Sequence, residues 1–420
     1  WINRDRFVLS NGHACALQYI MLHLTGYDIS LDNLKKFRQI GSILPGHPEH
    51  HLTPGIEVST GPLGQGIANG VGIALGLKHL ASIYNTDNIQ LIDNTVYVLC
   101  GDGCLMEGIS YEAISFAGHL WLDNLVLIYD DNGITIDGDI SLAFSENIQK
   151  RFESSGWYVQ TINDGNNWEN IQKPLLNAKN YKGKPSLIIL KTTIGYGSYK
   201  EGTSKVHGSP LGKDDIDQFK EISGLDVNKD FHIDELVSKF YESCKRNGRE
   251  TESKWLEKFV TYKKLYPDKA NDLLRRLDNK LPNNWEEQLP KYTSDDPPIA
   301  TRKCSQKVLT NIYKTIPELL GGSADLTPSN LTFIDSKMSY SNYKGRYIHY
   351  GIREHAMAAI ANGLSTTNMI IPYVGTFFNF LQYCLPAVRL SALSNHKVIY
   401  IMTHDSVWLG EDGPTHQPVE

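Results

Sequence analysis

Two oxygen-bearing side chains each follow an apolar run of the sequence. Asp102 comes just after the run 95–100, and Asn132 stands thirty residues later, at the end of the run that begins at 124. If both runs are parallel strands joined by one crossover, their carboxyl ends lie side by side, and both side chains can meet one ion. With a backbone carbonyl near Ile134, this set suits Mg²⁺ or Ca²⁺, which keep places for phosphate oxygens. Taken alone, either residue is equally typical of a turn at a strand end.

A second carboxyl group stands at the start of a predicted helix. Glu354 follows the strand-like run 347–349 and opens the apolar segment 354–359. In such a setting the pKa of the carboxyl group is expected to be raised, so that it could share a proton with a ring nitrogen. The alternative is a first-turn glutamate favoured only by the helix dipole.

Strand and helix patterns alternate around these residues. Over residues 1–200 we predict strands at 95–100, 124–129, 158–162 and 186–191 and a helix over 107–120. Helix-length segments between strands predict a parallel α/β sheet. Residues 214–295 are charged with helical spacing, and a second α/β pattern starts at 299, with strands at 347–349 and 398–402. The predicted domains are 1–265 and 299–420, separated by a linker over 266–298.

The bulk composition is that of an ordinary globular protein. The 420 residues include 41 Lys and Arg against 47 Asp and Glu, a net charge of −6, and 41 % are apolar. These values exclude disordered proteins and disulfide scaffolds. No apolar run is long enough to span a membrane. The acidic net charge argues against a nucleic-acid partner. The six cysteines form no Cys-x-x-Cys pair, which predicts reduced thiols. The chain opens at Trp1, without Met, so we expect it to be part of a longer product.

Several motifs together resemble one enzyme family. Gly101-Asp102-Gly103 through Asn132 resembles the thiamine diphosphate and magnesium motif. The flanking blocks resemble those of transketolases, and they are 5–14, 45–49, 60–66, 321–327, 351–356 and 410–418. The chain is therefore identified as a member of that family. The resemblance implies a thiamine diphosphate-binding α/β fold with two doubly wound parallel-sheet domains, the second truncated, and a chain that lacks the family's amino-terminal segment and carboxyl-terminal part.

The resemblance also implies a cofactor site. Thiamine diphosphate supplies an ylid that acts as an electron sink. The implied Mg²⁺ ligands are Asp102, Asn132 and the carbonyl of Ile134, with Ca²⁺ as an alternative ion. Glu354 is implied to protonate the aminopyrimidine. The other implied cofactor contacts are His13, Gly61, Pro62, Leu63, Gly103, Glu107, Asn132, His207, Phe377, Phe380 and Tyr383.

Two groups of these cofactor contacts have a second interpretation. Phe377, Phe380 and Tyr383 follow at i, i+3 and i+6, which predicts one helical face and would otherwise indicate core packing. Leu63 precedes a predicted helix whose glycines would otherwise be a face for close helix packing, and they are Gly64, Gly66, Gly70, Gly72 and Gly76. Glu107, on the predicted helix 107–120, resembles the family's dimer-interface acid that links two active sites.

The implied reaction is the transfer of a two-carbon ketol unit in the pentose phosphate pathway. The donor is a ketose phosphate such as xylulose 5-phosphate, and the acceptor is ribose 5-phosphate or erythrose 4-phosphate. His207 and His416 are our candidates for proton transfer, a task suited to imidazoles. The implied sugar and phosphate contacts are His47, Arg302, Ser329, His404, Asp412 and His416.

The resemblance further implies a homodimer with its active sites at the subunit interface. A cytoplasmic location is expected, and the missing amino terminus leaves a plastid open. Two alternatives share most of the motifs: a dihydroxyacetone synthase, which accepts formaldehyde, and a non-catalytic transketolase-like binding protein. A nicotinamide-dependent dehydrogenase is disfavoured, because no Gly-x-Gly-x-x-Gly stands between a first strand and helix.

Overall fold

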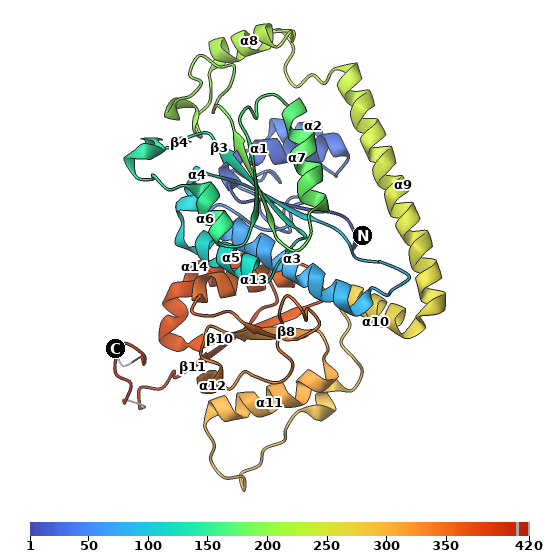
Figure 1. Cartoon of the computed structure of the whole chain (residues 1–420), viewed down its shortest axis with the longest axis vertical. Helices are drawn as coiled ribbons and strands as arrows, with labels where there is room; N and C mark the ends of the chain where they lie inside the picture. The colour runs from blue at the N-terminus through green and yellow to red at the C-terminus, as the bar shows by residue number, and fades with distance from the viewer. Residues whose placement is uncertain (409–410, 419–420) are drawn as a thin grey trace. The chain divides into compact units, whose positions relative to one another are not determined.

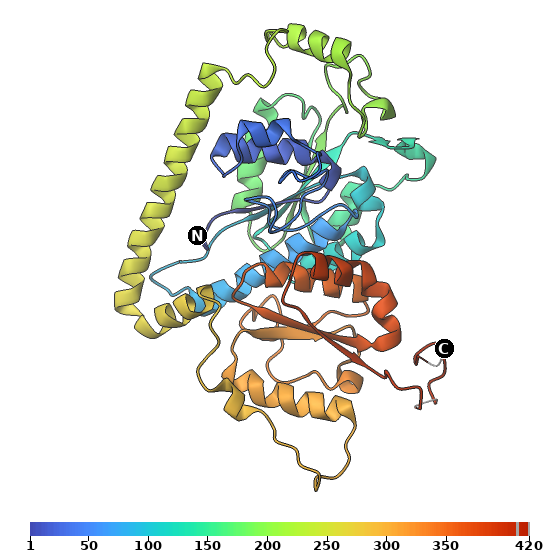
Figure 2. The same ribbon diagram turned by 180° about the vertical axis from the view of Figure 1, so that it is seen from behind.

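The computed structural model describes residues 1–408 and 411–418, which form two compact units (Figures 1 and 2). The first unit comprises residues 1, 3–67 and 94–256, and the second comprises residue 2, residues 68–93 and the chain from 257 onward. This division differs from the predicted boundaries 1–265, 266–298 and 299–420, because residues 68–93 group with the carboxyl-terminal part of the chain.

The first unit contains a five-stranded sheet in which all strands are parallel, as the alternating pattern predicts. In spatial order the strands are β1 (Arg6–Leu9), β2 (Val96–Gly101), β3 (Leu125–Asp131), β7 (Ser186–Lys191) and β6 (Tyr158–Ile162). The predicted strands 158–162 and 186–191 are confirmed. The predicted strand 95–100 is found one residue later, the predicted strand 124–129 is found at 125–131, and β1 was not predicted as a strand.

Helices and short segments complete the first unit. They are η1 (Gly12–Ala14), α1 (Cys15–Thr25), α2 (Leu31–Lys35), α4 (Asp102–Met106), α5 (Gly108–His119), β4 (Ile134–Thr135), β5 (Gly138–Asp139), η2 (Ile140–Leu142), α6 (Ile148–Ser154), α7 (Glu169–Asn180), η3 (Ser204–Val206), α8 (Lys213–Ile222) and most of α9 (Glu235–Leu265), whose residues from 257 onward belong to the second unit. One core cluster joins Ala178 of α7 to Val126, Ile162 and Ile188 of three neighbouring strands.

The second unit contains a four-stranded sheet that is also fully parallel. In spatial order its strands are β11 (Ile399–Thr403), β10 (Ile371–Phe377), β8 (Leu319–Ser323) and β9 (Tyr347–His349). Helix α11 (Thr301–Thr315) covers one face, while α13 (Glu354–Ser365) and α14 (Leu381–Leu393) cover the other (Figure 1). Leu309 and Tyr313 of α11 pack against Leu319, Tyr347 and Tyr373 of the sheet.

The remaining elements of the second unit are α3 (Gln65–Tyr84), whose first three residues belong to the first unit, α10 (Pro267–Leu277), η4 (Trp285–Gln288), α12 (Thr327–Asn330) and η5 (Phe378–Phe380). The predicted linker 266–298 thus begins with a helix. Arg276 of α10 is buried and forms an ion pair with Glu318, and Tyr84 of α3 donates a hydrogen bond to Asp272 at 2.6 Å. These contacts anchor α10 in the second unit, so this part of the segment is not a free linker.

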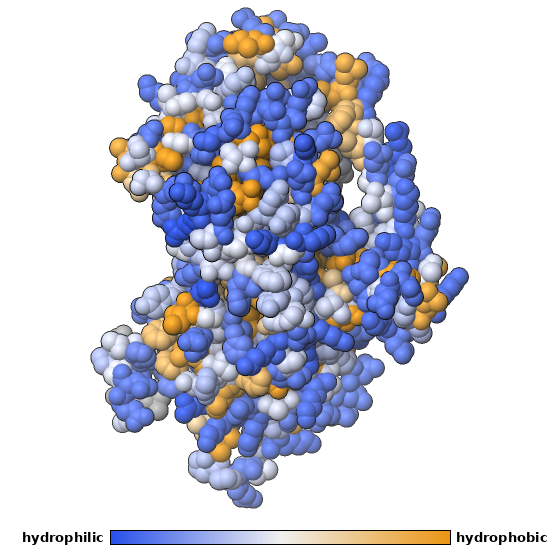
Figure 3. Space-filling view, viewed as in Figure 1, coloured by the Kyte–Doolittle hydropathy of each residue, from blue (hydrophilic) through white to orange (hydrophobic). Residues whose placement is uncertain are grey.

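Three further features concern the cysteines, the hydropathy of the helices and the exposed apolar side chains. All six cysteines are free thiols, as predicted. In the part of the chain that the structure describes, no helix is long and apolar enough to cross a membrane. Apolar side chains are exposed on α8 and at the start of α9, among them Ile222, Leu236 and Phe240. Figure 3 shows orange, apolar atoms near its top, where these two elements lie in Figure 1.

Candidate functional site

The predicted ion-binding residues follow two neighbouring strands. Strands β2 and β3 pair in parallel, with Gly101 opposite Asp130. Asp102 starts α4 directly after β2, and Asn132 follows the last residue of β3. The predicted crossover between adjacent strands is confirmed, and it brings both residues to the carboxyl end of the same sheet.

The Asp102 carboxyl group is buried, and its two oxygens have different surroundings. Oδ1 accepts a hydrogen bond from the Tyr129 hydroxyl at 2.5 Å, whereas Oδ2 has no hydrogen-bond partner among the described residues. Burial raises the pKa of Asp102 to about 6, and the Tyr129 hydroxyl and the Gly133 N–H work against that shift. A buried carboxylate oxygen without a donor is costly unless it meets a cation. The Asp102 carboxyl group therefore fits a metal ligand.

The Asn132 side chain is held in a fixed orientation. Its Oδ1 accepts a hydrogen bond from the Ile134 N–H at 3.1 Å, and its Nδ2 donates to Asp130 Oδ2 at 3.1 Å. An amide oxygen has two lone pairs, so Oδ1 can still ligate an ion. Among the described residues no group of three His, Cys, Asp or Glu side chains could hold a metal. The predicted set is of another kind, with one carboxylate, one amide and one backbone carbonyl.

The backbone segments predicted to approach a diphosphate lie close together. A Cβ atom added at Gly103 would be 2.8 Å from Leu63 Cδ1, so any larger residue would have to displace that methyl group. A Cβ atom added at Gly61 would be 3.6 Å from the His47 ring, which places that histidine beside the segment 61–63.

Three of the predicted histidines are neighbours in the first unit. The rings of His13 and His207 lie 4.8 Å apart between centroids. Burial lowers the pKa of His13, and the nearby His207 and His47 rings lower it further. Burial also lowers the pKa of His207, whose Nδ1 has no hydrogen-bond partner among the described residues. The fold thus gathers imidazoles from three distant parts of the sequence, and the lowered pKa values of His13 and His207 favour the neutral form of those two rings.

The prediction that Glu107 lies on a helix over 107–120 is wrong. Glu107 adopts an extended conformation, with φ −71° and ψ 133°, between the end of α4 and the start of α5. Its carbonyl accepts a hydrogen bond from the Ser110 N–H at 3.1 Å, so Glu107 is the N-cap residue of α5 and not part of the helix. Glu107 lies between α4 and α5, where its side chain is exposed and its Cβ atom lies beside Gly64.

In the second unit, Glu354 is the first residue of α13, as predicted. It follows β9 and a turn in which Gly351 has φ +68°. Burial raises the pKa of Glu354, and its charge helps to raise the pKa of the Cys384 thiol on α14. Burial therefore favours the neutral, protonated form of this carboxyl group over the charged form.

The predicted aromatic helical face does not exist. Phe377 ends strand β10, Phe380 lies in η5, and Tyr383 lies in α14. The rings nevertheless form a row, with Phe377 stacked on Phe380 at 5.7 Å and Tyr383 at 6.0 Å beyond it. Phe377 is buried, but Tyr383 is 65 % exposed. The strand end, rather than helical periodicity, brings these rings together.

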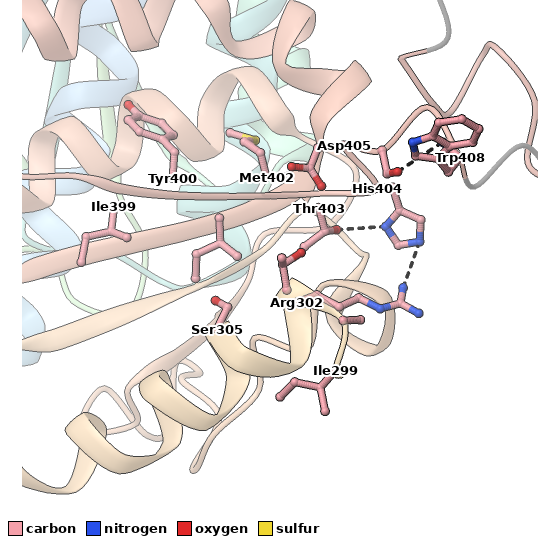
Figure 4. Close-up of a pocket in the computed structure, with 14 residues that line it drawn as sticks. Ile299, Arg302, Ser305, Ile399, Tyr400, Met402, Thr403, His404, Asp405 and Trp408 are labelled. Atoms are coloured by element: carbon pink, nitrogen blue, oxygen red, sulfur yellow. Dashed lines mark hydrogen bonds between the residues drawn. The ribbon is translucent and has the colours of Figure 1, made fainter. Parts of the chain in front are cut away.

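Two predicted phosphate contacts are direct neighbours at an open cleft of about 720 Å³, lined by the start of α11 and by β11 with the residues after it (Figure 4). Arg302 donates a hydrogen bond to His404 Nε2 at 3.1 Å, because a guanidinium can only donate. The neutral ring then carries its proton on Nδ1, which faces the Thr403 hydroxyl at 3.0 Å. Burial and the neighbouring Arg302 charge lower the pKa of His404, which favours this neutral form.

Two of the remaining predicted residues of the second unit, His416 and Asp412, lie near His404. The exposed His416 ring lies 5.3 Å from Phe380 and 6.1 Å from Phe377. Asp412 lies near His404, and its carboxylate raises the pKa of His404, although burial and Arg302 lower that pKa more strongly. Ser329 lies in α12. Gly410, part of the motif 410–418, lies outside the described residues.

Sequence reasoning missed several residues whose hydrogen bonds hold the predicted site residues of the two units in place. Tyr129 holds Asp102, and the buried Asn330 donates a hydrogen bond from Nδ2 to Thr403 Oγ1 at 2.6 Å. Asn330 in turn accepts one from the Ser323 hydroxyl at 2.8 Å. The sequence signal for Tyr129 is a polar aromatic residue at the carboxyl end of an apolar strand. Thr403 occupies the same kind of position, at the end of β11.

Comparison with known proteins identifies the family. Residues 1–282 match the family model described as transketolase, thiamine diphosphate binding domain, and residues 297–420 match that of transketolase, pyrimidine binding domain. The whole chain is 54 % identical to Transketolase 1 of Saccharomyces cerevisiae and covers 63 % of it.

Solved structures agree with the sequence matches. The whole chain is similar to two transketolase structures from Pichia stipitis, each with 50 % identity and a TM-score of 0.98 over 63 % of that chain. One is a mutant complex with xylulose 5-phosphate and the other is a complex with sedoheptulose 7-phosphate. The present chain thus spans less than two thirds of the length of these relatives. With domain models of one family matching both parts of it, the chain belongs to the transketolase family.

Proposed function

We propose that the protein containing this chain is a transketolase, which transfers a two-carbon ketol unit from xylulose 5-phosphate to ribose 5-phosphate or erythrose 4-phosphate. The observation that carries this proposal is the gathering of Asp102, the segment 61–63 and three histidines at one end of the first unit's sheet. A relative of known structure binds sedoheptulose 7-phosphate, the seven-carbon ketose that this reaction forms.

The cofactor of the proposed reaction is thiamine diphosphate with Mg²⁺. When bound, thiamine diphosphate supplies the nucleophilic carbon and the electron sink for C–C cleavage. Asp102 Oδ2, Asn132 Oδ1 and the carbonyl of Ile134 would hold the ion, and the donor set suits Mg²⁺ or Ca²⁺. The segment 61–63 and Gly103 would let the backbone approach the diphosphate.

The chain's own residues supply the proton transfers. The raised pKa of Glu354 suits a carboxyl group that shares a proton with the aminopyrimidine ring. His207 and His416 would exchange protons with the sugar hydroxyl groups, His13 and His47 would line the cofactor and donor, and Asp412 would accept a hydrogen bond from a donor hydroxyl. Phe377 and Phe380 already stack, and with Tyr383 they would border the aminopyrimidine.

The phosphate end of the sugar requires fixed positive groups, because the chain as a whole is acidic. Arg302 would provide the guanidinium fork and Ser329 a further donor, while His404 would border the sugar phosphate and hold the guanidinium through its Nε2. The Arg302–His404 hydrogen bond, backed by Thr403, fixes the guanidinium in advance and lowers the entropic cost of binding.

We also propose that two subunits share each active site, with the first unit of one subunit and the second unit of its partner supplying residues. Glu107 would then link the two sites. The support is the distribution of the predicted residues: those for metal and diphosphate fall in the first unit, whereas Glu354, the aromatic rings and the phosphate contacts fall in the second. A cytoplasmic location is proposed as well and can be tested by cell fractionation.

A product assay tests the proposed reaction. The complete gene product is incubated with thiamine diphosphate, Mg²⁺ and xylulose 5-phosphate, and ribose 5-phosphate and formaldehyde are offered in parallel. We expect sedoheptulose 7-phosphate, identified by mass. Dihydroxyacetone from formaldehyde alone would replace the proposal with a dihydroxyacetone synthase. Neither product, with the cofactor bound, would indicate a non-catalytic binding protein.

A further inference from the structure

We propose that Tyr129 is a positioning residue, whose hydroxyl fixes the Asp102 carboxylate so that Oδ2 alone is presented to the metal ion. This inference rests on the proposed function, because the metal site is part of it. Tyr129 is not one of the predicted site residues, and it touches the reaction only through Asp102.

The contact between the two side chains is buried and short. Tyr129 is 2 % exposed and Asp102 is 3 % exposed, and the hydroxyl donates to Asp102 Oδ1 at 2.5 Å. Asp131 Oδ1 is a second acceptor, at 3.3 Å from the same hydroxyl. A phenol has a single hydrogen to donate, so the shorter bond, to Asp102, is the one it makes.

The neighbouring carboxylates have partners of their own. Asp131 forms an ion pair with Lys191 at 3.8 Å, and Asp130 accepts hydrogen bonds from Thr192 and from Asn132 Nδ2. The Tyr129 hydroxyl is therefore left to Asp102. The strand register explains its reach, because Tyr129 lies opposite Cys100, two residues before Asp102.

This bond makes the two oxygens of Asp102 unequal. A carboxylate that can rotate offers either oxygen or both to an ion, and a ligand fixed by a hydrogen bond offers one. With Oδ1 engaged, the only oxygen left is Oδ2, which is buried and has no hydrogen-bond partner among the described residues. Outer-shell partners of this kind commonly change metal affinity 10- to 100-fold when they are removed.

The test is Tyr129→Phe in the complete gene product, which removes one oxygen atom and keeps the packing of the ring. Mg²⁺ binding is measured by calorimetry at saturating thiamine diphosphate, and the melting temperature of the metal-free protein is measured beside it. We expect the Kd for Mg²⁺ to rise about 10- to 100-fold, with cofactor binding restored by excess Mg²⁺ and the melting temperature nearly unchanged. With Mn²⁺ as the probe, the electron paramagnetic resonance spectrum of the bound ion should change as well.

Tyr111→Phe is the matched control. The Tyr111 hydroxyl donates to the Glu146 carboxylate at 3.2 Å in the same unit, and neither residue is a predicted metal ligand or forms a hydrogen bond with Asp102 in the part of the chain that the structure describes. Its substitution should leave the Mg²⁺ affinity and the Mn²⁺ spectrum as in the wild type. A nonspecific effect of losing a tyrosine–carboxylate hydrogen bond would appear in both variants.

The outcomes separate this inference from the proposed function. If Tyr129→Phe binds Mg²⁺ like the wild type while Asp102→Ala does not, the positioning role is overturned and the metal site stands. If Asp102→Ala also binds Mg²⁺ and thiamine diphosphate like the wild type, the metal site itself is wrong. A lowered melting temperature with an unchanged Kd and spectrum would reduce Tyr129 to a packing residue.

Discussion

Gly72 of α3 and Gly363 of α13 lie against each other where the two helices cross in the second unit. A Cβ atom added at Gly72 would be 2.1 Å from the carbonyl oxygen of Ile360, and one added at Gly363 would be 2.1 Å from that of Asn69. Asn69 Nδ2 also donates to the Ala359 carbonyl of α13 at 2.8 Å. The helices therefore meet backbone to backbone, and the packing interpretation of the glycine-rich stretch after Leu63 is confirmed.

We predict that Gly363→Ala lowers the free energy of unfolding by about 1–3 kcal/mol, because the added methyl group must push two backbones apart. Urea unfolding of the purified protein measures this loss. Gly248→Ala is the matched control, since Gly248 lies on an exposed part of α9 with no atom within 4 Å of an added Cβ. That control should stabilise the protein by about 0.5–1 kcal/mol, through helix propensity alone. Equal effects of the two substitutions would contradict the close crossing.

His79 of α3 should make stability depend on pH. Burial lowers the pKa of His79 from 6.5 to about 4, and its Nδ1 donates to the Tyr343 carbonyl at 2.8 Å. Between pH 6.5 and pH 4, His79 is mostly protonated in the unfolded chain but mostly neutral in the folded protein. The free energy of unfolding should therefore fall as the pH falls, by about 3 kcal/mol by pH 4 from this group alone.

The contribution of His79 can be isolated with His79→Gln, which keeps a donor but does not titrate. Between pH 7.5 and pH 5 the wild type should lose about 2 kcal/mol more stability than the variant does. Urea unfolding at the two pH values gives both numbers. Equal losses would show that His79 is not held neutral in the folded state.

Glu354→Gln should leave thiamine diphosphate affinity within a few-fold of the wild type and lower turnover by roughly 10²- to 10⁴-fold, because the amide cannot exchange a proton with the aminopyrimidine. Cofactor titration and steady-state kinetics on the same preparation separate the two effects. Glu286→Gln, at an exposed glutamate of η4, serves as the control with unchanged turnover. A Glu354→Gln enzyme with normal turnover would remove this residue from the mechanism.

The sequence predicts the parts of the fold that local patterns determine. The apolar runs 158–162 and 186–191 become strands with those bounds, and Glu354 starts its helix as expected. The strands β8 and β10 were not predicted, because Gly321 and Gly322 in β8 and Pro372 in β10 weaken the local strand signal. The sheet's hydrogen bonds and burial override that signal.

The candidate site could be predicted in its residues but not in its geometry. Spacing alone suggested that Asp102 and Asn132 meet, because two neighbouring strands need only one crossover. The contact between His13 and His207, or between Arg302 and His404, joins segments far apart in the sequence and depends on tertiary packing. The prediction of one helical face was wrong for the three aromatic residues at i, i+3 and i+6. Phe377 ends a strand, Phe380 lies in a 3₁₀ helix and Tyr383 lies in an α-helix.

The central claim is that residues of the two units meet in one active site formed by two subunits, and mixed dimers test it most directly. Asp102→Ala and Glu354→Gln chains carrying different tags are coexpressed, and dimers holding one of each are purified through both tags. We predict about half the wild-type activity, because one of the two symmetric sites carries both substitutions and the other carries neither. Mixed dimers as inactive as either parent would contradict the claim, since each site would then be built from a single chain.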